Sequence, residues 1–362
     1  MLARQVAAYA GLLAWAFLAG GTAPATAGEA TRAYPPFGLL ETSGMALSVL
    51  HDGVVWVVED SGEPPDELPV VRAFDPSGAE VGSVTLAGWN NRDTEAVSMG
   101  PGPTLWVADI GDNHAVRETV VVHTFDEPAE LGATTLEPVS YRLRYPDGPR
   151  DAESLMIDPV DGRLYVATKS AFGAGSLYVA PATLAAGETH DLALVSSLPS
   201  WITDGSFTPD GARLVLLRAL PSVRGEALTF EVTRPGAGAP MRLAEGDAAQ
   251  LPDQEQGESL TITPDGATTL VGSEGADEPI WAVPLPAGPS QPTRSTAGES
   301  SATPGGSDLT AGPDACRLAD PMSCLDGPAG WLTATGVALA GLIVGALAVL
   351  RRRDRGQRRS TM

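Results

Sequence analysis

The chain has 362 residues, with 45 acidic against 23 basic side chains and a formal net charge of −22. Such a surface repels nucleic acid, which we do not expect as a partner, and anionic lipid; it tolerates cations, and a polyanionic substrate would need a metal bridge. The length accommodates more than one structural unit, and a hydrophobic segment stands near each end.

The first 27 residues have the pattern of a secretory signal peptide. Arg4 gives a basic start, residues 6–20 form an apolar core, and Ala25-Thr26-Ala27 is a small-residue cleavage motif. We expect export and cleavage after Ala27. The alternative is an uncleaved anchor helix, but the apolar core is short for a helix that crosses a membrane.

Residues 30–286 contain a pattern repeated five times. Each copy has an apolar strand, a turn such as Asp52-Gly53 or Asp265-Gly266, and a second apolar strand. Asp-Gly between apolar runs favours a hairpin, because glycine accepts the positive φ of the turn. A third strand follows in every copy and a fourth in four copies. The copies begin 50 to 58 residues apart, at Ser43, Glu95, Glu153, Thr203 and Glu258.

Four short antiparallel strands per repeat are typical of a β-propeller blade. We therefore predict an all-β fold with a single propeller over residues 30–286, in five four-stranded blades rather than six. Residues 31–41 have no partner in their own copy, so we expect them to supply the strand missing from the fifth copy and close the ring. A chain of β-sandwiches would need modules of about 100 residues.

The rest of the chain predicts attachment to a membrane. Residues 287–328 are rich in Pro, Ser, Thr and Gly and predict a disordered stalk. Residues 329–350 contain 20 consecutive uncharged residues, enough for one transmembrane helix. The arginines of residues 351–362 predict a cytoplasmic tail. We expect a single-pass protein of the cell membrane with an extracellular propeller. A sortase-processed tail would be similar, but no LPxTG-like motif precedes the run.

The two cysteines, Cys316 and Cys324, lie in the predicted stalk. In an oxidising exterior they could form a disulfide that closes a small loop. Free thiols and a bridge between two chains are the alternatives.

The repeat brings acidic residues to one mouth of the propeller channel. The first strand of each blade lines the channel, and the end of the second strand lies at the same face. Six residues at these positions are candidates for ligand binding: Glu95, Glu153, Glu258, Lys169, Arg218 and Asp204. Lys169 is the only lysine in the chain.

Carboxylates gathered around one axis repel one another, so a cation, the basic side chains or raised pKa values must offset them. Carboxylate and amide oxygens suit a hard ion such as Ca²⁺. The candidate ligands, which lack EF-hand spacing, are Asp60, Asp93, Glu95, Asp109, Asp112 and Asn113. The alternative is structural, since Asp and Asn cap turns and a channel Glu can accept a backbone N–H of the next blade.

Several segments resemble a group of secreted propellers of high-GC bacteria, which is related to WD-repeat, NHL and phytase-like propellers. They are RDTEAV, LWVADIGDN, RDAESLMIDPVDGRLYVATK and GESLTITPDGATTLVGSEG. The resemblance covers most of residues 40–286 and implies the propeller fold. It transfers no catalytic residue, because such folds carry many functions.

Two functions fit these patterns. The first is a ligand- or protein-binding module at the cell surface that catalyses nothing, since no G-x-S-x-G, HExxH or phosphate-binding loop occurs. Its partner would be a surface protein or a small molecule. The second is a Ca²⁺-dependent phytase-like or lactonase-like hydrolase, in which the ion at the acidic mouth polarises the substrate or activates water.

Overall fold

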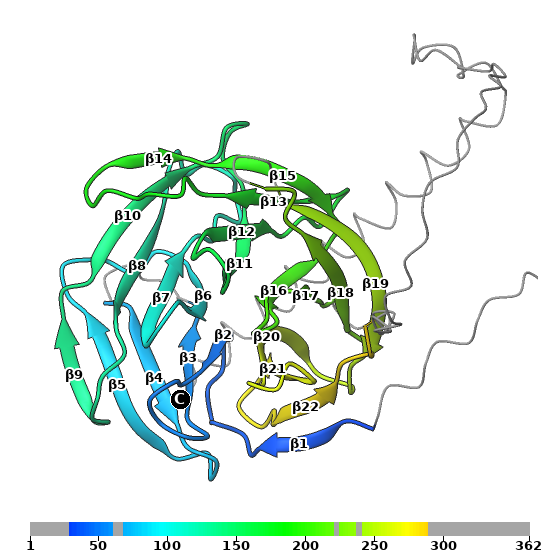
Figure 1. The fold of residues 1–362 in the computed structure, drawn as a ribbon. Coiled ribbons are helices and arrows are strands. Elements are labelled where there is room, and N and C mark those ends of the chain that lie inside the picture. The colour runs from blue at the N-terminus through cyan, green and yellow to red at the C-terminus, as the bar shows by residue number, and fades with distance from the viewer. Residues whose placement is uncertain (1–28, 61–67, 221–223, 237–240, 289–362) are drawn as a thin grey trace, which may run out of the picture. The chain divides into compact units, whose positions relative to one another are not determined.

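The computed structural model describes residues 29–60, 68–220, 224–236 and 241–288, which form five sheets arranged around a central axis (Figure 1). The predicted signal peptide, transmembrane helix and tail lie outside these residues, as do Cys316, Cys324 and nearly all of the predicted stalk. In the part of the chain that is described, no helix has the length and apolar character needed to cross a membrane.

Each sheet is one blade, numbered here from the first complete one. Blade 1 has β2 (Thr42–Leu47), β3 (Val55–Glu59), β4 (Val70–Phe74) and β5 (Glu80–Leu86). Blade 2 has β6 (Thr94–Met99), β7 (Thr104–Asp109), β8 (Val120–Asp126) and β10 (Val139–Arg144). Blade 3 has β11 (Ala152–Ile157), β12 (Leu164–Thr168), β13 (Gly175–Val179) and β15 (Ala193–Leu198).

Blade 4 has β16 (Ile202–Phe207), β17 (Arg213–Arg218), β18 (Glu226–Thr233) and β19 (Arg242–Gln250). Blade 5 has β20 (Gln256–Ile262), β21 (Thr268–Glu274), β22 (Ile280–Pro284) and, as its outer strand, β1 (Thr31–Tyr34). The pairing of β1 with β22 is antiparallel, with Thr31 opposite Ala282. The five-bladed propeller is confirmed, and so is its closure by the N-terminal strand.

Two further strands were not predicted. β9 (Ala133–Leu136) pairs in parallel with β5, and β14 (Thr189–Asp191) pairs in parallel with β10. Each comes from the link between the third and fourth strands of the following blade, and each adds a fifth strand to the preceding one (Figure 1). The added strands cover the outer edges of blades 1 and 2.

The hydrophobic core lies between neighbouring blades. One cluster joins blades 2 and 3 through residues such as Leu155 and Tyr178, and another joins blades 1 and 2 around Trp56. A blade that packs on both faces is covered on both, so all six residues of β11 are buried, Glu153 and Ser154 included. The second strands, such as β12 with the sequence LYVAT, have the near-continuous apolar runs expected of a strand buried on both faces.

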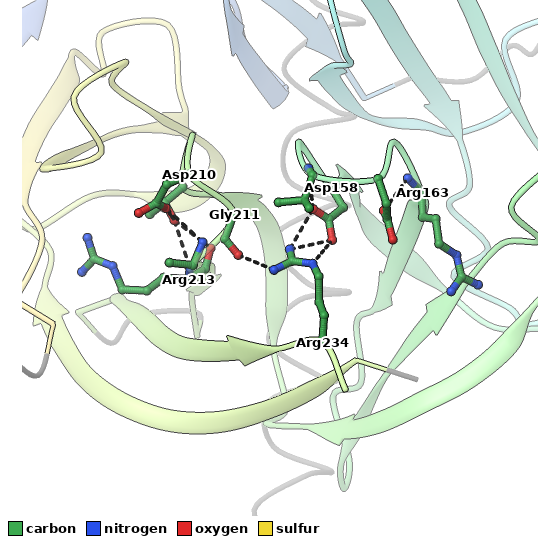
Figure 2. A network of polar contacts seen from close by, with 10 residues as sticks. Asp158, Arg163, Asp210, Gly211, Arg213 and Arg234 are labelled. Atoms are coloured by element: carbon green, nitrogen blue, oxygen red, sulfur yellow. Dashed lines mark hydrogen bonds and ion pairs between the residues drawn. The ribbon is translucent and has the colours of Figure 1, made fainter. Parts of the chain in front are cut away.

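The hairpin turns at the face opposite the acidic residues are linked across blades. Arg234, just after β18, pairs with Asp158 in the β11–β12 turn, with Nη2 2.6 Å from Oδ2, and donates to the carbonyl of Gly211 at 2.9 Å (Figure 2). Gly211 has a φ of +67°, and a Cβ there would lie 2.5 Å from Val160 Cγ2. The Pro209-Asp210-Gly211 turn of blade 4 thus needs glycine both for its backbone and for its close contact with blade 3.

Candidate functional site at the channel mouth

The predicted ring residues occupy an irregularity that all five inner strands share. In each blade the register between the first and second strands shifts at one position, which leaves one extra residue on the first strand. Such a bulge redirects a side chain away from regular strand geometry. The extra residues are the five that begin the sequence repeats: Ser43, Glu95, Glu153, Thr203 and Glu258.

Lys169, Glu153 and Glu258 come together at the mouth, as predicted. Lys169 Nζ contacts Glu153 Oε1 and lies 3.6 Å from Glu258 Oε1. The two glutamates are each 4% exposed and come from blades 3 and 5. Between them, blade 4 has the shorter Thr203, whose hydroxyl donates to the carbonyl of Gly257 at 2.9 Å. The short residue in blade 4 leaves the two carboxyls free to meet. We call Lys169, Glu153 and Glu258 the lysine triad.

A second group of carboxylates consists of Asp60, Asp93 and Glu95. Asp60 follows β3, Asp93 precedes β6, and Glu95 lies in β6. One carboxylate oxygen of each residue lies within 4.8 Å of the others, so that one ion can contact all three. Glu95 Oε2 accepts a hydrogen bond of 2.7 Å from Ser43 Oγ, while Asp60 Oδ1 is buried without a hydrogen-bond partner among the described groups. We call Asp60, Asp93 and Glu95 the acidic trio.

A glycine keeps the space beside the acidic trio open. A Cβ at Gly111 would lie 2.5 Å from Asp93 Oδ2 and 2.6 Å from Glu95 Oε1. Atoms cannot approach that closely, so any side chain here would displace both carboxylates. Gly111 is held by its N–H, which donates to the carbonyl of Asp93 at 3.1 Å. The sequence motif Asp-Ile-Gly-Asp-Asn therefore contributes its glycine to the site.

Burial and mutual repulsion shift the acid–base equilibria of the mouth. Burial, together with the neighbouring Asp93, raises the pKa of Asp60 to about 8. Burial and the Glu153 charge raise the pKa of Glu95 well above its ordinary value. Burial and Glu258 do the same to the pKa of Glu153. These groups are costly to ionise together, so they retain protons or attract a cation.

Lys169 behaves in the opposite way. Burial would lower the pKa of its ammonium, but the charges of Glu153 and Glu258 outweigh burial and raise that pKa well above its ordinary value. Lys169 is therefore a permanent positive charge. Burial also raises the pKa of Glu258, although Lys169 opposes the shift.

Three predicted metal ligands lie outside the acidic trio. Asp109 forms an ion pair of 2.7 Å with Arg117, and both side chains are buried. Asp112 Oδ2 accepts a hydrogen bond of 2.7 Å from the backbone N–H of Arg117. Asn113 is exposed. Arg117 could not be predicted as a partner, because an arginine in an acidic loop carries no spacing signal. Arg117 is therefore the partner of two carboxylates that were predicted to bind the metal, those of Asp109 and Asp112.

The two remaining candidates have partners elsewhere. Asp204 is buried and accepts the N–H of Leu260 at 2.6 Å and that of Gly205 at 2.7 Å, which ties blade 4 to blade 5. Arg218 pairs with Glu226 at 2.7 Å in the neighbouring strand. Both contacts fit the structural alternative. Ligand binding by either residue stays a prediction.

No family model and no curated protein matches the sequence. Among solved structures, a glucose dehydrogenase-like oxidoreductase of Thermus thermophilus is 12% identical, with a TM-score of 0.39 over 70% of this chain and 99% of that one. A gluconolactonase of Xanthomonas campestris is 14% identical, with a TM-score of 0.38 over 71% and 89%. The PQQ domain of a Coprinopsis cinerea pyranose dehydrogenase is 12% identical, with a TM-score of 0.42 over 71% and 95%. The assignment as a propeller rests on the five sheets themselves.

Proposed function

We propose that the protein is a binding module whose channel mouth holds a hard divalent cation, Ca²⁺ above all, and through it a ligand that offers oxygen atoms. The observation that carries this proposal is the unequal distribution of positive charge at the mouth. The lysine triad has its own ammonium, whereas none of the three carboxylates of the acidic trio forms an ion pair with a basic side chain of the described residues.

The donor set of the acidic trio suits Ca²⁺. It consists only of carboxylate oxygens, which hard cations prefer. Ca²⁺ takes six to eight oxygen ligands, so three protein carboxylates leave coordination positions for a ligand and water. An ammonium has three N–H donors and Lys169 faces two glutamates, so one donor remains for a ligand oxygen.

The same proposal places the module outside the cell. Its support is the signal-peptide pattern of residues 1–27 and the apolar run of residues 329–350 with its arginine-rich end. A stalk of residues 287–328 would hold the propeller away from the membrane. The partner would be a surface protein or a small molecule, and nucleic acid is excluded by charge.

A second candidate is a Ca²⁺-dependent hydrolase. It is favoured by the carboxyl groups of Glu153 and Glu258, whose raised pKa values keep protons near the proposed ion. A protonated carboxyl beside a metal-activated water can act as a general acid. Detectable turnover of phosphoesters, lactones or carboxyl esters, lost in Glu258→Gln, would decide for this candidate.

The test of the cation proposal is a thermal melt of the full-length chain in EDTA and then in Ca²⁺. At a Ca²⁺ concentration about 100-fold above Kd, one site that exists only in the folded state adds about 2.7 kcal/mol of stability. We expect a clear rise in Tm that is lost in Asp60→Asn and kept in Asp253→Asn, a matched change at an exposed carboxylate. Equal Tm values in EDTA and Ca²⁺ would refute the proposal.

A further inference from the structure

The lysine triad contains one positive charge where two buried carboxyls meet. Glu153 and Glu258 are each 4% exposed, and Lys169 Nζ approaches the Oε1 atom of both. The Oε2 atom of each glutamate is buried and receives no hydrogen bond from an N–H or O–H of the described residues. Of the four carboxyl oxygens, the two Oε1 atoms face the ammonium, Glu258 Oε1 also accepts a hydrogen bond from Gln256 Nε2, and the two Oε2 atoms have no partner among the described residues.

Lysine is an unusual choice for this position in this chain, which uses it nowhere else. An arginine would bring a planar guanidinium, whose charge is delocalised over five donors in a fixed fork. The lysine ammonium is compact, strongly hydrated in water and roughly spherical in its charge. In size and charge distribution it resembles a metal ion more than arginine does.

We propose that the lysine triad is a second cation site of the channel mouth, and that the Lys169 ammonium permanently occupies it. Glu153 and Glu258 supply the same ligand chemistry as the acidic trio, oxygen atoms of buried carboxylates. Because the ammonium is attached to the chain, this site is filled at every Ca²⁺ concentration. Only the acidic trio then responds to free Ca²⁺.

A covalently attached cation also explains why the two carboxyls tolerate burial without an external ion. The ammonium neutralises one of them, and burial, which raises the pKa of both carboxyls, favours a proton on the other. Removal of the ammonium leaves two buried carboxyls whose one remaining side-chain donor among the described residues is Gln256, which reaches Glu258 Oε1. Ca²⁺ accepts bidentate carboxylates and can replace both the ammonium and the proton.

The test is the number of Ca²⁺ ions bound per chain, measured by equilibrium dialysis and elemental analysis of the full-length protein with Ca²⁺ as the only probe. These counts include one ion at the acidic trio and so rest on the proposed function, whereas the gain of one ion in Lys169→Met over the wild type does not. We expect one ion in the wild type and two in Lys169→Met. The double variant Lys169→Met/Glu258→Gln, with half of the site neutralised, should return to one ion.

Each result has a defined meaning. A folded Lys169→Met that binds no more Ca²⁺ than the wild type overturns the inference. If Lys169→Met is unfolded in EDTA and folds in millimolar Ca²⁺, the inference is supported; if it stays unfolded in Ca²⁺ while the double variant folds, the inference is refuted. A wild type that binds no Ca²⁺, next to a Lys169→Met that binds one ion, would refute the proposed function and leave this inference intact.

Discussion

The carboxyls of Glu153 and Glu258 meet at the Lys169 ammonium, although Glu153 lies in blade 3 and Glu258 in blade 5. The residue at the equivalent position of the intervening blade, Thr203, is shorter and donates its hydroxyl to the Gly257 carbonyl. Burial raises the pKa of both carboxyls, which favours a proton on one of them.

The first prediction concerns Glu258→Gln. The pKa of Glu258 is raised in the folded protein, so its contribution to stability is present at low pH and is lost as the pH rises through the folded-state value. Glutamine cannot ionise and leaves Lys169 paired with Glu153 alone. We expect the metal-free variant to have a higher Tm than the wild type at pH 9 and a smaller advantage at pH 5. A variant less stable than the wild type at pH 9 would show that Lys169 needs both carboxylates.

The second prediction is a pH dependence caused by Asp60. Its pKa is about 8 when folded and near 3.8 in an unfolded chain, so the folded state binds the extra proton between these values. Stability in EDTA should therefore fall as the pH rises from about 4 to about 8 and then level off. Asp60→Asn should flatten this dependence, measured by urea unfolding at several pH values. Identical slopes in both proteins would contradict the assignment.

Gly111→Ala should damage the site more than the fold. The new methyl group would lie 2.5 Å from Asp93 Oδ2, so Asp93 and Glu95 must move apart. We expect at least a tenfold weaker Ca²⁺ affinity by titration calorimetry. Gly257→Ala is the control, because a Cβ there meets Ala219 Cβ at an ordinary 3.4 Å. Equal loss of affinity in both variants would mean that the space beside the trio is not what matters.

The fourth prediction lies at the opposite face, where Glu127 links blade 2 to blade 1. Its buried carboxylate accepts the Trp56 indole N–H at 2.7 Å and the backbone N–H groups of Val49 and Leu50, both at 3.1 Å. Glu127→Ala leaves buried donors without an acceptor, and we expect a loss of about 3 kcal/mol in urea unfolding. The exposed neighbour Asp126→Asn should cost little. Ca²⁺ affinity should remain unchanged in both.

The fifth prediction concerns the link between Arg234 and Asp158 (Figure 2). Asp158 is fully buried, so Arg234→Met leaves a buried charge without its partner and should cost about 3–5 kcal/mol. The double variant Asp158→Asn/Arg234→Met should recover a large part of that loss, because no charge stays buried. A double variant as unstable as the single one would show that Arg234 acts through its bond to Gly211 and not through charge.

The propeller could be predicted because its information is local and repeated. Asp-Gly turns at Gly53 and Gly266 fix hairpins, and spacing of the copies then fixes the number of blades. The strands β9 and β14 could not be predicted, because each is three or four residues long and exposed, with no apolar pattern of its own. Each pairs with the open edge of the preceding blade, and that edge cannot be recognised from the sequence of the short strand itself.

The candidate site was predictable only as far as the repeat extends. Alignment of the copies brought Glu95, Glu153 and Glu258 to one mouth, because equivalent bulge positions face the same axis. It could not decide the partners of residues between the copies. Asp109 and Asp112 contact Arg117, whereas Asp60 lies beside Asp93 and Glu95. Which partner each carboxylate contacts depends on how far its side chain reaches toward the next blade.

The closure of blade 5 by β1 has a consequence for the order of events during synthesis. Among the described strands, β1 is synthesised first and its partner β22 last. β1 therefore stays without its partner while the intervening blades are made, and blades 1 and 2 lack their fifth strands until β9 and β14 have emerged. The ring can close only after all five blades have been made, so a chain interrupted before Ile280 cannot complete blade 5.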